Sequence, residues 1–95
     1  MSEITVTVKY LNLAREKAGL SEEAISLGKE ARVADLLGAL RTVHTPEFGE
    51  YLFKQDGELQ SYIRVVGGRD STQLPIDRVL TDGETIHLFV AHSGG

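Results

Sequence analysis

The sequence predicts an α+β fold, in which a mixed sheet packs on one main helix. Two observations support this prediction: apolar and polar residues alternate at both ends of the chain, and a single long amphipathic helix lies between them. One such helix covers one face of one sheet, and 95 residues suffice for one domain. We therefore expect one domain over residues 1–91 and a flexible C-terminal tail over residues 92–95.

The N-terminal part of the chain has the pattern of two strands joined by a long loop. Alternating apolar residues mark the first strand: Ile4, Val6, Val8 and Tyr10. Residues 11–18 predict a helical turn that ends at Gly19, and residues 23–27 predict the second strand. The two strands are expected to form a hairpin.

Residues 32–43 predict the main helix. Its apolar stripe has the spacing of one helix face and consists of Val33, Leu36, Leu37, Leu40 and Val43. Residues 47–53 then predict a short turn that places Phe48, Leu52 or Phe53 under the sheet.

The C-terminal half contains the remaining strands. Residues 62–66 predict a third strand, and residues 71–74 predict a short strand after a glycine-containing turn. Pro75 favours a single helical turn over residues 75–80, because proline suits the first position of a helix. A tight turn then leads into the last strand, residues 85–91, whose inward side chains are Ile86, Leu88 and Val90.

The order of these elements favours one arrangement of the sheet. The first and last strands lie side by side and parallel at its centre, joined by the right-handed crossover that such connections prefer. This is the β-grasp, or ubiquitin-like, arrangement. Its last strand directs the C-terminal residues off the sheet and into solvent.

Composition and charge exclude several classes of function. The net charge is −4 and the chain has no run of Lys and Arg, so neither nucleic acid nor an anionic membrane is expected as a partner. The absence of cysteine excludes disulfides and thiolate nucleophiles. The N-terminus does not resemble a signal peptide and no segment has transmembrane length, so the expected location is cytoplasmic.

The chain closes with His92-Ser93-Gly94-Gly95. Glycine lacks a Cβ and adopts nearly any backbone conformation, so this tail could thread into a narrow site. The plain alternative is a frayed terminus. Two final glycines occur by chance in roughly 0.5 % of chains, so the dipeptide is unusual without being decisive.

The run from Asp82 to Gly95 resembles the C-terminus of the MoaD/ThiS sulfur-carrier family, whose members have an Asp-Gly-Asp turn, an apolar strand and a final Gly-Gly at this spacing. The segment Val33-Ala34-Asp35-Leu36-Leu37 is similar to the start of the family's helix. The sequence departs from the family pattern in four places. Val66-Gly67-Gly68 stands where many relatives have a Val-Asn-Gly turn, and the loop over residues 44–60 is long for a minimal member. Glu84 replaces the second Asp of the turn, and Val90-Ala91 stand where a molybdopterin synthase small subunit often has two prolines.

The resemblance implies a chemistry for the tail. A partner activating enzyme would use ATP to convert the Gly95 carboxylate into an acyl-adenylate, and a persulfide would displace AMP to leave a thiocarboxylate. Gly94, Ser93 and His92 would form the rest of the tail. The chain would be carrier and substrate rather than enzyme, with no bound cofactor, and Gly67-Gly68 lacks the residues that would complete a P-loop.

Phe89 is the residue predicted to bind a partner, with His87 on the same outward face of the last strand. An exposed aromatic side chain is a common anchor of interfaces; the alternative is that residues 44–60 cover it. No metal site is expected, because His44, His87 and His92 lack the spacing of metal ligands. These histidines are predicted to be solvated, as are the acidic residues Glu22, Glu23, Asp35 and Glu50.

Several destinations of the sulfur remain open. The resemblance favours molybdopterin synthesis, with a sulfur-acceptor enzyme such as the molybdopterin synthase large subunit as the second partner. Thiamin, cysteine and thiolated tRNA are alternatives. Two other classes of function are a ubiquitin-like modifier joined through Gly95 to lysines of target proteins, and a binding module whose tail has no chemistry.

Overall fold

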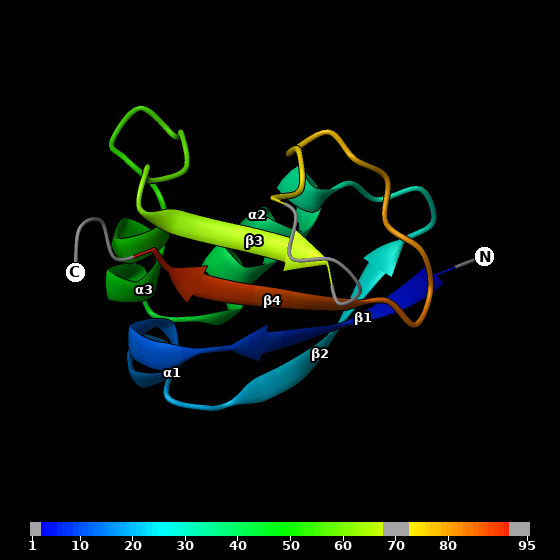
Figure 1. The fold of residues 1–95 in the computed structure, drawn as a ribbon. Coiled ribbons are helices and arrows are strands. Elements are labelled where there is room, and N and C mark those ends of the chain that lie inside the picture. The colour runs from blue at the N-terminus through cyan, green and yellow to red at the C-terminus, as the bar shows by residue number, and fades with distance from the viewer. Residues whose placement is uncertain (1–2, 68–72, 92–95) are drawn as a thin grey trace.

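The computed structural model describes residues 3–67 and 73–91, and Figure 1 shows their arrangement. The strands within these residues are β1 (Glu3–Tyr10), β2 (Glu22–Gly28), β3 (Ile63–Gly67) and β4 (Thr85–Val90). They form one mixed sheet in the order β2-β1-β4-β3. The predicted mixed sheet of an α+β fold is therefore confirmed.

The first and last strands, β1 and β4, form the centre of the sheet and run parallel. Their register places Thr7 opposite Thr85 and Tyr10 opposite Leu88. On the two outer sides, β2 pairs antiparallel with β1 and β3 pairs antiparallel with β4. Because the central strands are parallel, the start of β1 and the end of β4 lie at opposite ends of the molecule (Figure 1).

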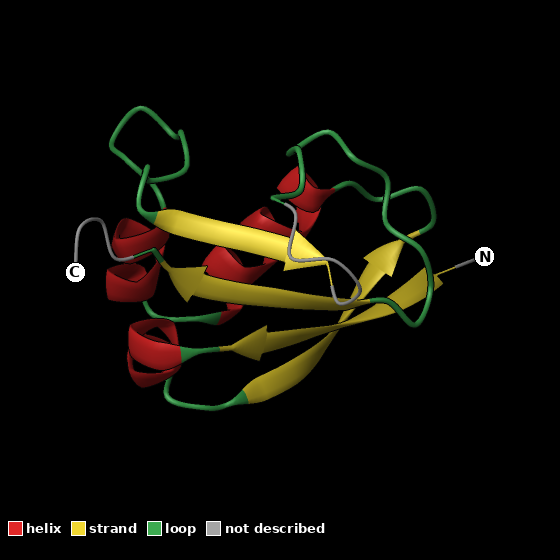
Figure 2. Cartoon of the chain, viewed as in Figure 1, coloured by secondary structure: helices red, strands yellow, loops and turns green. Residues whose placement is uncertain are grey.

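The main helix, α2 (Val33–Val43), crosses behind the strands in Figure 2 and packs on the face of the sheet that carries the core. Its buried side chains are Val33, Leu36, Leu37 and Leu40, as predicted. Val43 was expected in the same stripe, but its side chain is 60 % exposed. That prediction is wrong because Val43 is the last helical residue and extends beyond the part of the helix that the sheet covers.

Two short helices, α1 (Asn12–Ala18) and α3 (Pro46–Leu52), lie at the end of the sheet where β4 ends (Figures 1 and 2). The side chain of Thr45 accepts a hydrogen bond of 3.3 Å from the backbone N–H of Phe48 and so caps the start of α3. Phe48 and Leu52 are buried in the core. None of the helices in the described part of the chain is long and apolar enough to cross a membrane.

The segment that follows β3 differs from the prediction. Residues 71 and 72 of the strand expected at 71–74 lie outside the described residues, and the other half shows an isolated bridge between Val66 and Gln73. Residues 75–80 do not form a helical turn. They contain a single turn in which the N–H of Arg78 donates to the carbonyl of Pro75 at 3.2 Å.

The carbonyl groups of this segment are used instead by the N-terminus of α2. The N–H of Ala34 donates to the carbonyl of Ile76 at 2.8 Å, and the N–H of Val33 donates to that of Arg78 at 3.0 Å. The first N–H groups of any helix lack partners within the helix. The carbonyls of residues 76 and 78 satisfy these donors, and residues 76–78 therefore extend past the start of α2. In a helical turn the same carbonyls would point along the turn and would not reach α2.

The Asp82-Gly83 turn fastens the start of β4 to β1. Oδ1 of Asp82 accepts a hydrogen bond of 2.8 Å from the N–H of Thr5, and the N–H of Gly83 donates to the carbonyl of Thr5 at 2.8 Å. Gly83 has φ 82°, a left-handed conformation that glycine adopts without steric cost. Both residues of the turn thus have a structural role, which is to set the register of the central strand pair.

Glu84 is the residue that holds this turn against the neighbouring segment. Its carboxylate lies 2.7 Å from Nη2 of Arg78 and accepts a hydrogen bond of 3.1 Å from the N–H of Thr81. Burial alone would raise the pKa of Glu84, but the hydrogen bonds and charge of Arg78, together with the hydrogen bonds from Thr81, lower it below its ordinary 4.5. A lowered pKa means that the ionised side chain stabilises the folded state.

Replacing Glu84 with glutamine is expected to lower the free energy of unfolding at pH 7 by about 1–2 kcal/mol. In the wild type, this contribution is present above pH 4.5 and disappears as the pH falls through the lowered pKa of the folded state. Urea unfolding between pH 2 and pH 7 should therefore show a smaller loss of stability with acid in Glu84→Gln. Glu58→Gln, at an exposed position, is the control, and an equal effect there would refute the assignment.

Three polar side chains meet at the end of β1, where the sequence predicted none. The carboxylate Oε2 of Glu23 accepts a hydrogen bond of 2.5 Å from the hydroxyl of Tyr10 and lies 2.5 Å from Nε2 of His44. The side chains of His44 and Glu23 are 12 % and 20 % exposed. The prediction that both are solvated is wrong, because the β1–β2 register and the end of α2 bring them together beside the ring of Phe48.

Burial, followed by the hydrogen bond to Glu23 and its charge, raises the pKa of Tyr10 well above its ordinary value. The phenol therefore remains a hydrogen-bond donor at every pH at which the protein is expected to work. Glu23 accepts from this phenol and binds the imidazole of His44 with the same oxygen. It is the centre of the cluster, and the only other contact between its members is the 3.4 Å distance from the hydroxyl of Tyr10 to Nε2 of His44.

Glu23→Ala is expected to lower the free energy of unfolding by about 1–2 kcal/mol, because the partly buried polar groups of Tyr10 and His44 lose their shared carboxylate and keep only their 3.4 Å contact with each other. Glu22→Ala provides a matched control at the preceding, exposed position, where a change within about 0.5 kcal/mol is expected. Urea unfolding at pH 7 measures both. Equal stabilities of the two variants would contradict this account of the cluster.

Candidate functional site

The end of β4 is the candidate functional site, because it places the last residues of the chain. Hydrogen bonds hold the strand on its two sides to different points. The N–H of Leu11 donates to the carbonyl of Leu88 at 3.0 Å, and the N–H of Ala91 donates to the carbonyl of Tyr62 at 2.8 Å. α1 and α3 flank this end of the sheet (Figure 1). The position and direction of the chain are thus fixed as far as Ala91.

The predicted tail, His92, Ser93, Gly94 and Gly95, lies outside the described residues. Its reach follows from chain geometry. A fully extended chain advances at most ~3.6 Å per residue, so four residues place the Gly95 carboxylate no more than about 14 Å from Ala91. A partner that acts on Gly95 must therefore come within this distance of the domain, and the surface around Ala91 would take part in its binding.

Phe89 and His87 lie on the outer face of β4, the face opposite the core, as predicted. Both side chains are half-buried. The register pairs Phe89 with Arg64 of β3 and His87 with Lys9 of β1. The outer face of the central strands therefore combines an aromatic ring with Lys9 and Arg64. Glu22 of β2 pairs with Lys9 on the same face, and the guanidinium of Arg64 donates to the carbonyl of Ser61 at 2.8 Å.

Other apolar side chains are exposed around the end of β4. The hydrogen bond from Leu11 to Leu88 continues the parallel pairing by one residue and places Leu11 beside Phe89 in the register. Leu11 is 40 % exposed, and Leu13 and Tyr62 are each 38 % exposed. We call Leu11, Leu13, Tyr62 and Phe89 the exit surface. A partner that fits it would have an apolar depression edged by carboxylates, which would face Lys9 and Arg64.

Sequence patterns did not identify most of the exit surface. Leu11 lies between β1 and α1, and only its continued pairing with β4 shows its position. Leu13 lies in the first turn of α1, where its side chain remains exposed. Residues 44–60 were considered as a cover for Phe89. They include α3 (Pro46–Leu52), whose buried side chains enter the core on the helix side of the sheet. Within residues 3–67 and 73–91, no group of three or more His, Asp or Glu side chains could hold a metal ion.

No protein-family model matches the chain, and no curated protein sequence matches it. Solved structures do match. The crystal structure of small archaeal modifier protein 1 from Haloferax volcanii is 27 % identical and superposes with a TM-score of 0.84, covering 96 % of this chain and 99 % of that one. This chain therefore has the ubiquitin-like β-grasp fold.

Two further structures show the range of proteins that share this β-grasp domain. A putative molybdopterin converting factor, subunit 1, from Pyrococcus furiosus is 28 % identical, with a TM-score of 0.75 and coverage of 94 % of this chain and 99 % of that one. A chain of the BexX/CysO complex from Amycolatopsis orientalis is 22 % identical, with a TM-score of 0.64 and coverage of 95 % and 99 %; this likeness concerns the fold alone. The predicted resemblance to MoaD/ThiS-type ubiquitin-fold proteins is confirmed.

Proposed function

We propose that this β-grasp domain is a sulfur carrier and that Gly95 provides the reactive C-terminal carboxylate. The observation that carries the proposal is the end of β4: hydrogen bonds hold the strand as far as Leu88 on the β1 side and as far as Ala91 on the β3 side, directly before a tail that closes with Gly94-Gly95. A fixed exit followed by four residues presents the carboxylate at a defined distance from the exit surface. The glycines allow an extended tail to enter a narrow active site.

The chemistry starts with a carboxylate, which is unreactive toward nucleophiles at neutral pH. In the proposed first step, the Gly95 carboxylate attacks the α-phosphate of ATP bound to an activating enzyme, and pyrophosphate leaves. A persulfide then attacks the acyl carbon and AMP leaves. A second thiol cleaves the S–S bond, so that the sulfur remains on Gly95 as a thiocarboxylate. The activating enzyme supplies the ATP site and the catalytic groups, and the chain is its substrate.

The exit surface is the proposed contact for both partners, the activating enzyme and the enzyme that accepts the sulfur. Both must reach the same carboxylate, which lies no more than about 14 Å from Ala91. They would therefore bind overlapping areas in turn. An apolar centre with positive charges at its edge suits such a temporary complex, because rim charges raise association rates while the buried apolar residues provide affinity.

Molybdopterin is the favoured destination of the sulfur. The support is the likeness to a protein described as a putative molybdopterin converting factor, subunit 1, together with the resemblance of the C-terminal sequence. An acceptor such as a molybdopterin synthase large subunit would then complete the pathway. Thiamin, cysteine and tRNA thiolation are the alternatives, and incubation of the thiocarboxylate form with each acceptor enzyme in turn would identify the pathway.

The intact mass of the protein tests the sulfur-carrier proposal. The purified chain is incubated with a matching activating enzyme, ATP and a sulfur donor, beside forms that lack Gly95 or carry one added alanine after it. We expect the mass gain of one sulfur-for-oxygen exchange in the wild type and in neither variant. No gain with several competent activating enzymes, or an equal gain in the variants, would refute the proposal.

A second candidate function is that of a protein modifier joined through Gly95 to lysine side chains. The likeness to small archaeal modifier protein 1 favours it specifically. The activation step is the same, but the acyl group passes to a lysine amine instead of a persulfide. Peptide mass spectrometry of proteins purified with a tagged chain would in this case show lysines that carry residues 79–95 as a remnant, because trypsin cleaves the chain last after Arg78. Finding the thiocarboxylate without any such remnant would leave the carrier function alone.

A further inference from the structure

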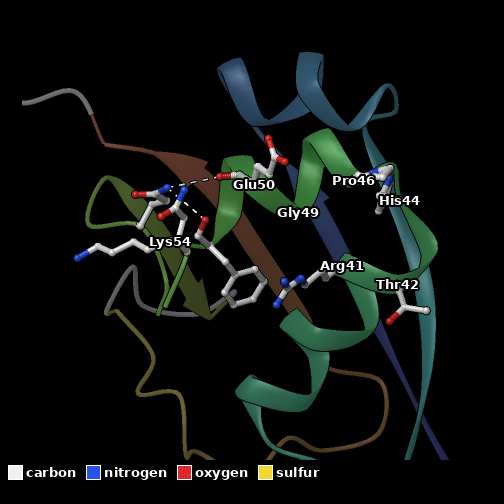
Figure 3. Close-up of a pocket in the computed structure, with 10 residues that line it drawn as sticks. Arg41, Thr42, His44, Pro46, Gly49, Glu50 and Lys54 are labelled. Atoms are coloured by element: carbon white, nitrogen blue, oxygen red, sulfur yellow. Dashed lines mark hydrogen bonds between the residues drawn. The ribbon is translucent and has the colours of Figure 1, made fainter. Parts of the chain in front are cut away.

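A hollow separate from the exit surface lies between the C-terminal end of α2, α3 and the segment that follows α3 (Figure 3). We call it the α2–α3 groove. Its volume is about 700 Å³, within the range of small-molecule sites. Residues 53–60 form one wall and are held by their own backbone: Phe53 and Leu59 form a bridge, and the N–H of Gln60 donates to the carbonyl of Leu52 at 2.8 Å. The wall is therefore preformed.

Arg41, in the last turn of α2, lies across α3. A Cβ placed on Gly49 would be 3.1 Å from Cγ of Arg41, so the missing side chain at Gly49 leaves room for the arginine stem. The guanidinium carbon lies 5.4 Å from the centre of the Phe53 ring, within the range of a cation–π contact. These two contacts hold the guanidinium at the groove before any ligand binds.

The guanidinium of Arg41 has no polar partner among residues 3–67 and 73–91. The ion pairs found there join His44 to Glu23 and Arg78 to Glu84. Glu50 also lines the groove, but Figure 3 shows its carboxylate pointing away from Arg41. A positioned guanidinium with free donors is a recognition element for a planar anion, because its forked N–H groups match two oxygens at once.

Two features of the groove select the kind of anion. The carbonyl end of α2 carries partial negative charge, and Glu50 adds a negative charge nearby, so a doubly charged phosphate is less favourable than a singly charged carboxylate. Lys54, also without an ion-pair partner in the described segments, adds one positive charge at the rim. The groove is also larger than a carboxylate alone and has room for the group that carries it.

We propose that the α2–α3 groove binds a carboxylate, carried by a peptide or by a small organic acid, with Arg41 as the main contact. The site is independent of the tail chemistry. It lies on the helix side of the domain and uses none of the residues of the exit surface, so both sites can be occupied at once.

Nuclear magnetic resonance of the full chain, labelled with nitrogen-15, tests this proposal with three probes. These are butyrate, which carries a single carboxylate, a capped Gly-Glu-Gly peptide and the matching capped Gly-Gln-Gly peptide. We expect saturable shifts of the amides of residues 41–44, 49 and 53–60 with the two carboxylate probes, at a dissociation constant on the order of 1 mM, and none with the Gln peptide. The carboxylate probe that binds more tightly shows whether the groove prefers a small organic acid or a peptide as the carrier of the carboxylate.

Variants of Arg41 provide the second part of the test. Arg41→Gln should weaken binding by about tenfold or more, and Arg41→Lys should have an intermediate effect because it keeps the charge and loses the fork. Lys29→Gln, at an exposed position between β2 and α2, removes the same charge and should leave affinity unchanged. If Arg41→Gln fails to fold, the affinities of Arg41→Lys and the wild type for the carboxylate probes are compared instead, and equal affinities would refute the role of Arg41.

Three results would overturn the proposal: no saturable shifts at these amides, an equal response to the Gln peptide, or equal weakening by Lys29→Gln and the Arg41 variants. A chain lacking Gly94 and Gly95 should bind the probes as the wild type does. Loss of sulfur transfer with intact groove binding would thus separate the failure of one function from that of the other.

Discussion

Gly94→Val is expected to slow thiocarboxylate formation by about a hundredfold or more, the size of loss that follows when a reacting group is displaced by about 1 Å. A β-branched side chain one residue from the reacting carbon restricts the backbone and adds bulk where the tail must pass. The measurement is the initial rate of mass gain with a fixed amount of activating enzyme, ATP and sulfur donor. The domain itself should remain folded, since the sheet and the core are formed by residues up to Val90.

Ser93→Val is the matched control for this prediction. The same side chain is introduced one position earlier, where the tail already carries a side chain, and a much smaller loss is expected. Equal losses in the two variants would mean that the bulk of the tail, rather than its last two residues, limits the reaction. Wild-type rates in both would contradict the proposed role of Gly94.

Phe89→Ala is expected to weaken binding of the activating enzyme by about thirtyfold, corresponding to the loss of an interface anchor worth about 2 kcal/mol. Phe89 is half-buried beside Leu11, and both lie near the point where the tail leaves the sheet. Calorimetric titration of the two proteins measures the effect, with far-ultraviolet circular dichroism to confirm the fold. Leu11→Ala should act in the same direction.

Val43→Ala provides the control for an exposed apolar side chain elsewhere. Val43 is 60 % exposed at the end of α2 and lies outside the exit surface, so the affinity should change by less than about twofold, as for surface substitutions in general. An equal loss of affinity in Val43→Ala and Phe89→Ala would show that the activating enzyme does not bind specifically at the end of β4. An unchanged affinity in Phe89→Ala would show that Phe89 is not part of the interface.

Most of the core could be predicted from residue spacing, because burial follows the period of each element. The alternation in β1 and the stripe of α2 each place their apolar residues on one face, and the structure buries those faces. The tight turn before β4 was also predictable, since Asp82 and Gly83 have local conformational preferences. The parallel pairing of the two terminal strands followed from the number of faces that one helix can cover.

The errors occur where a residue's environment depends on distant segments. Glu23 and His44 have the composition of surface positions, and only the pairing of β1 with β2 and the length of α2 bring them to Tyr10. Residues 75–80 have a helix-start pattern, but the N–H groups of α2 compete for their carbonyls. In both cases a tertiary hydrogen bond outweighs a local preference of about 1 kcal/mol or less.

The sequence by itself determined the fold class, the order of the elements and the residues proposed for the chemistry, because these depend on short periods and on the glycines that close the chain. Only the tertiary structure decided which surfaces accompany that chemistry. Leu11 joins Phe89 through the pairing of β1 with β4, and Arg41 meets Phe53 through the packing of α2 on α3. Such surfaces combine residues from separate elements, and no local pattern records how those elements will be placed.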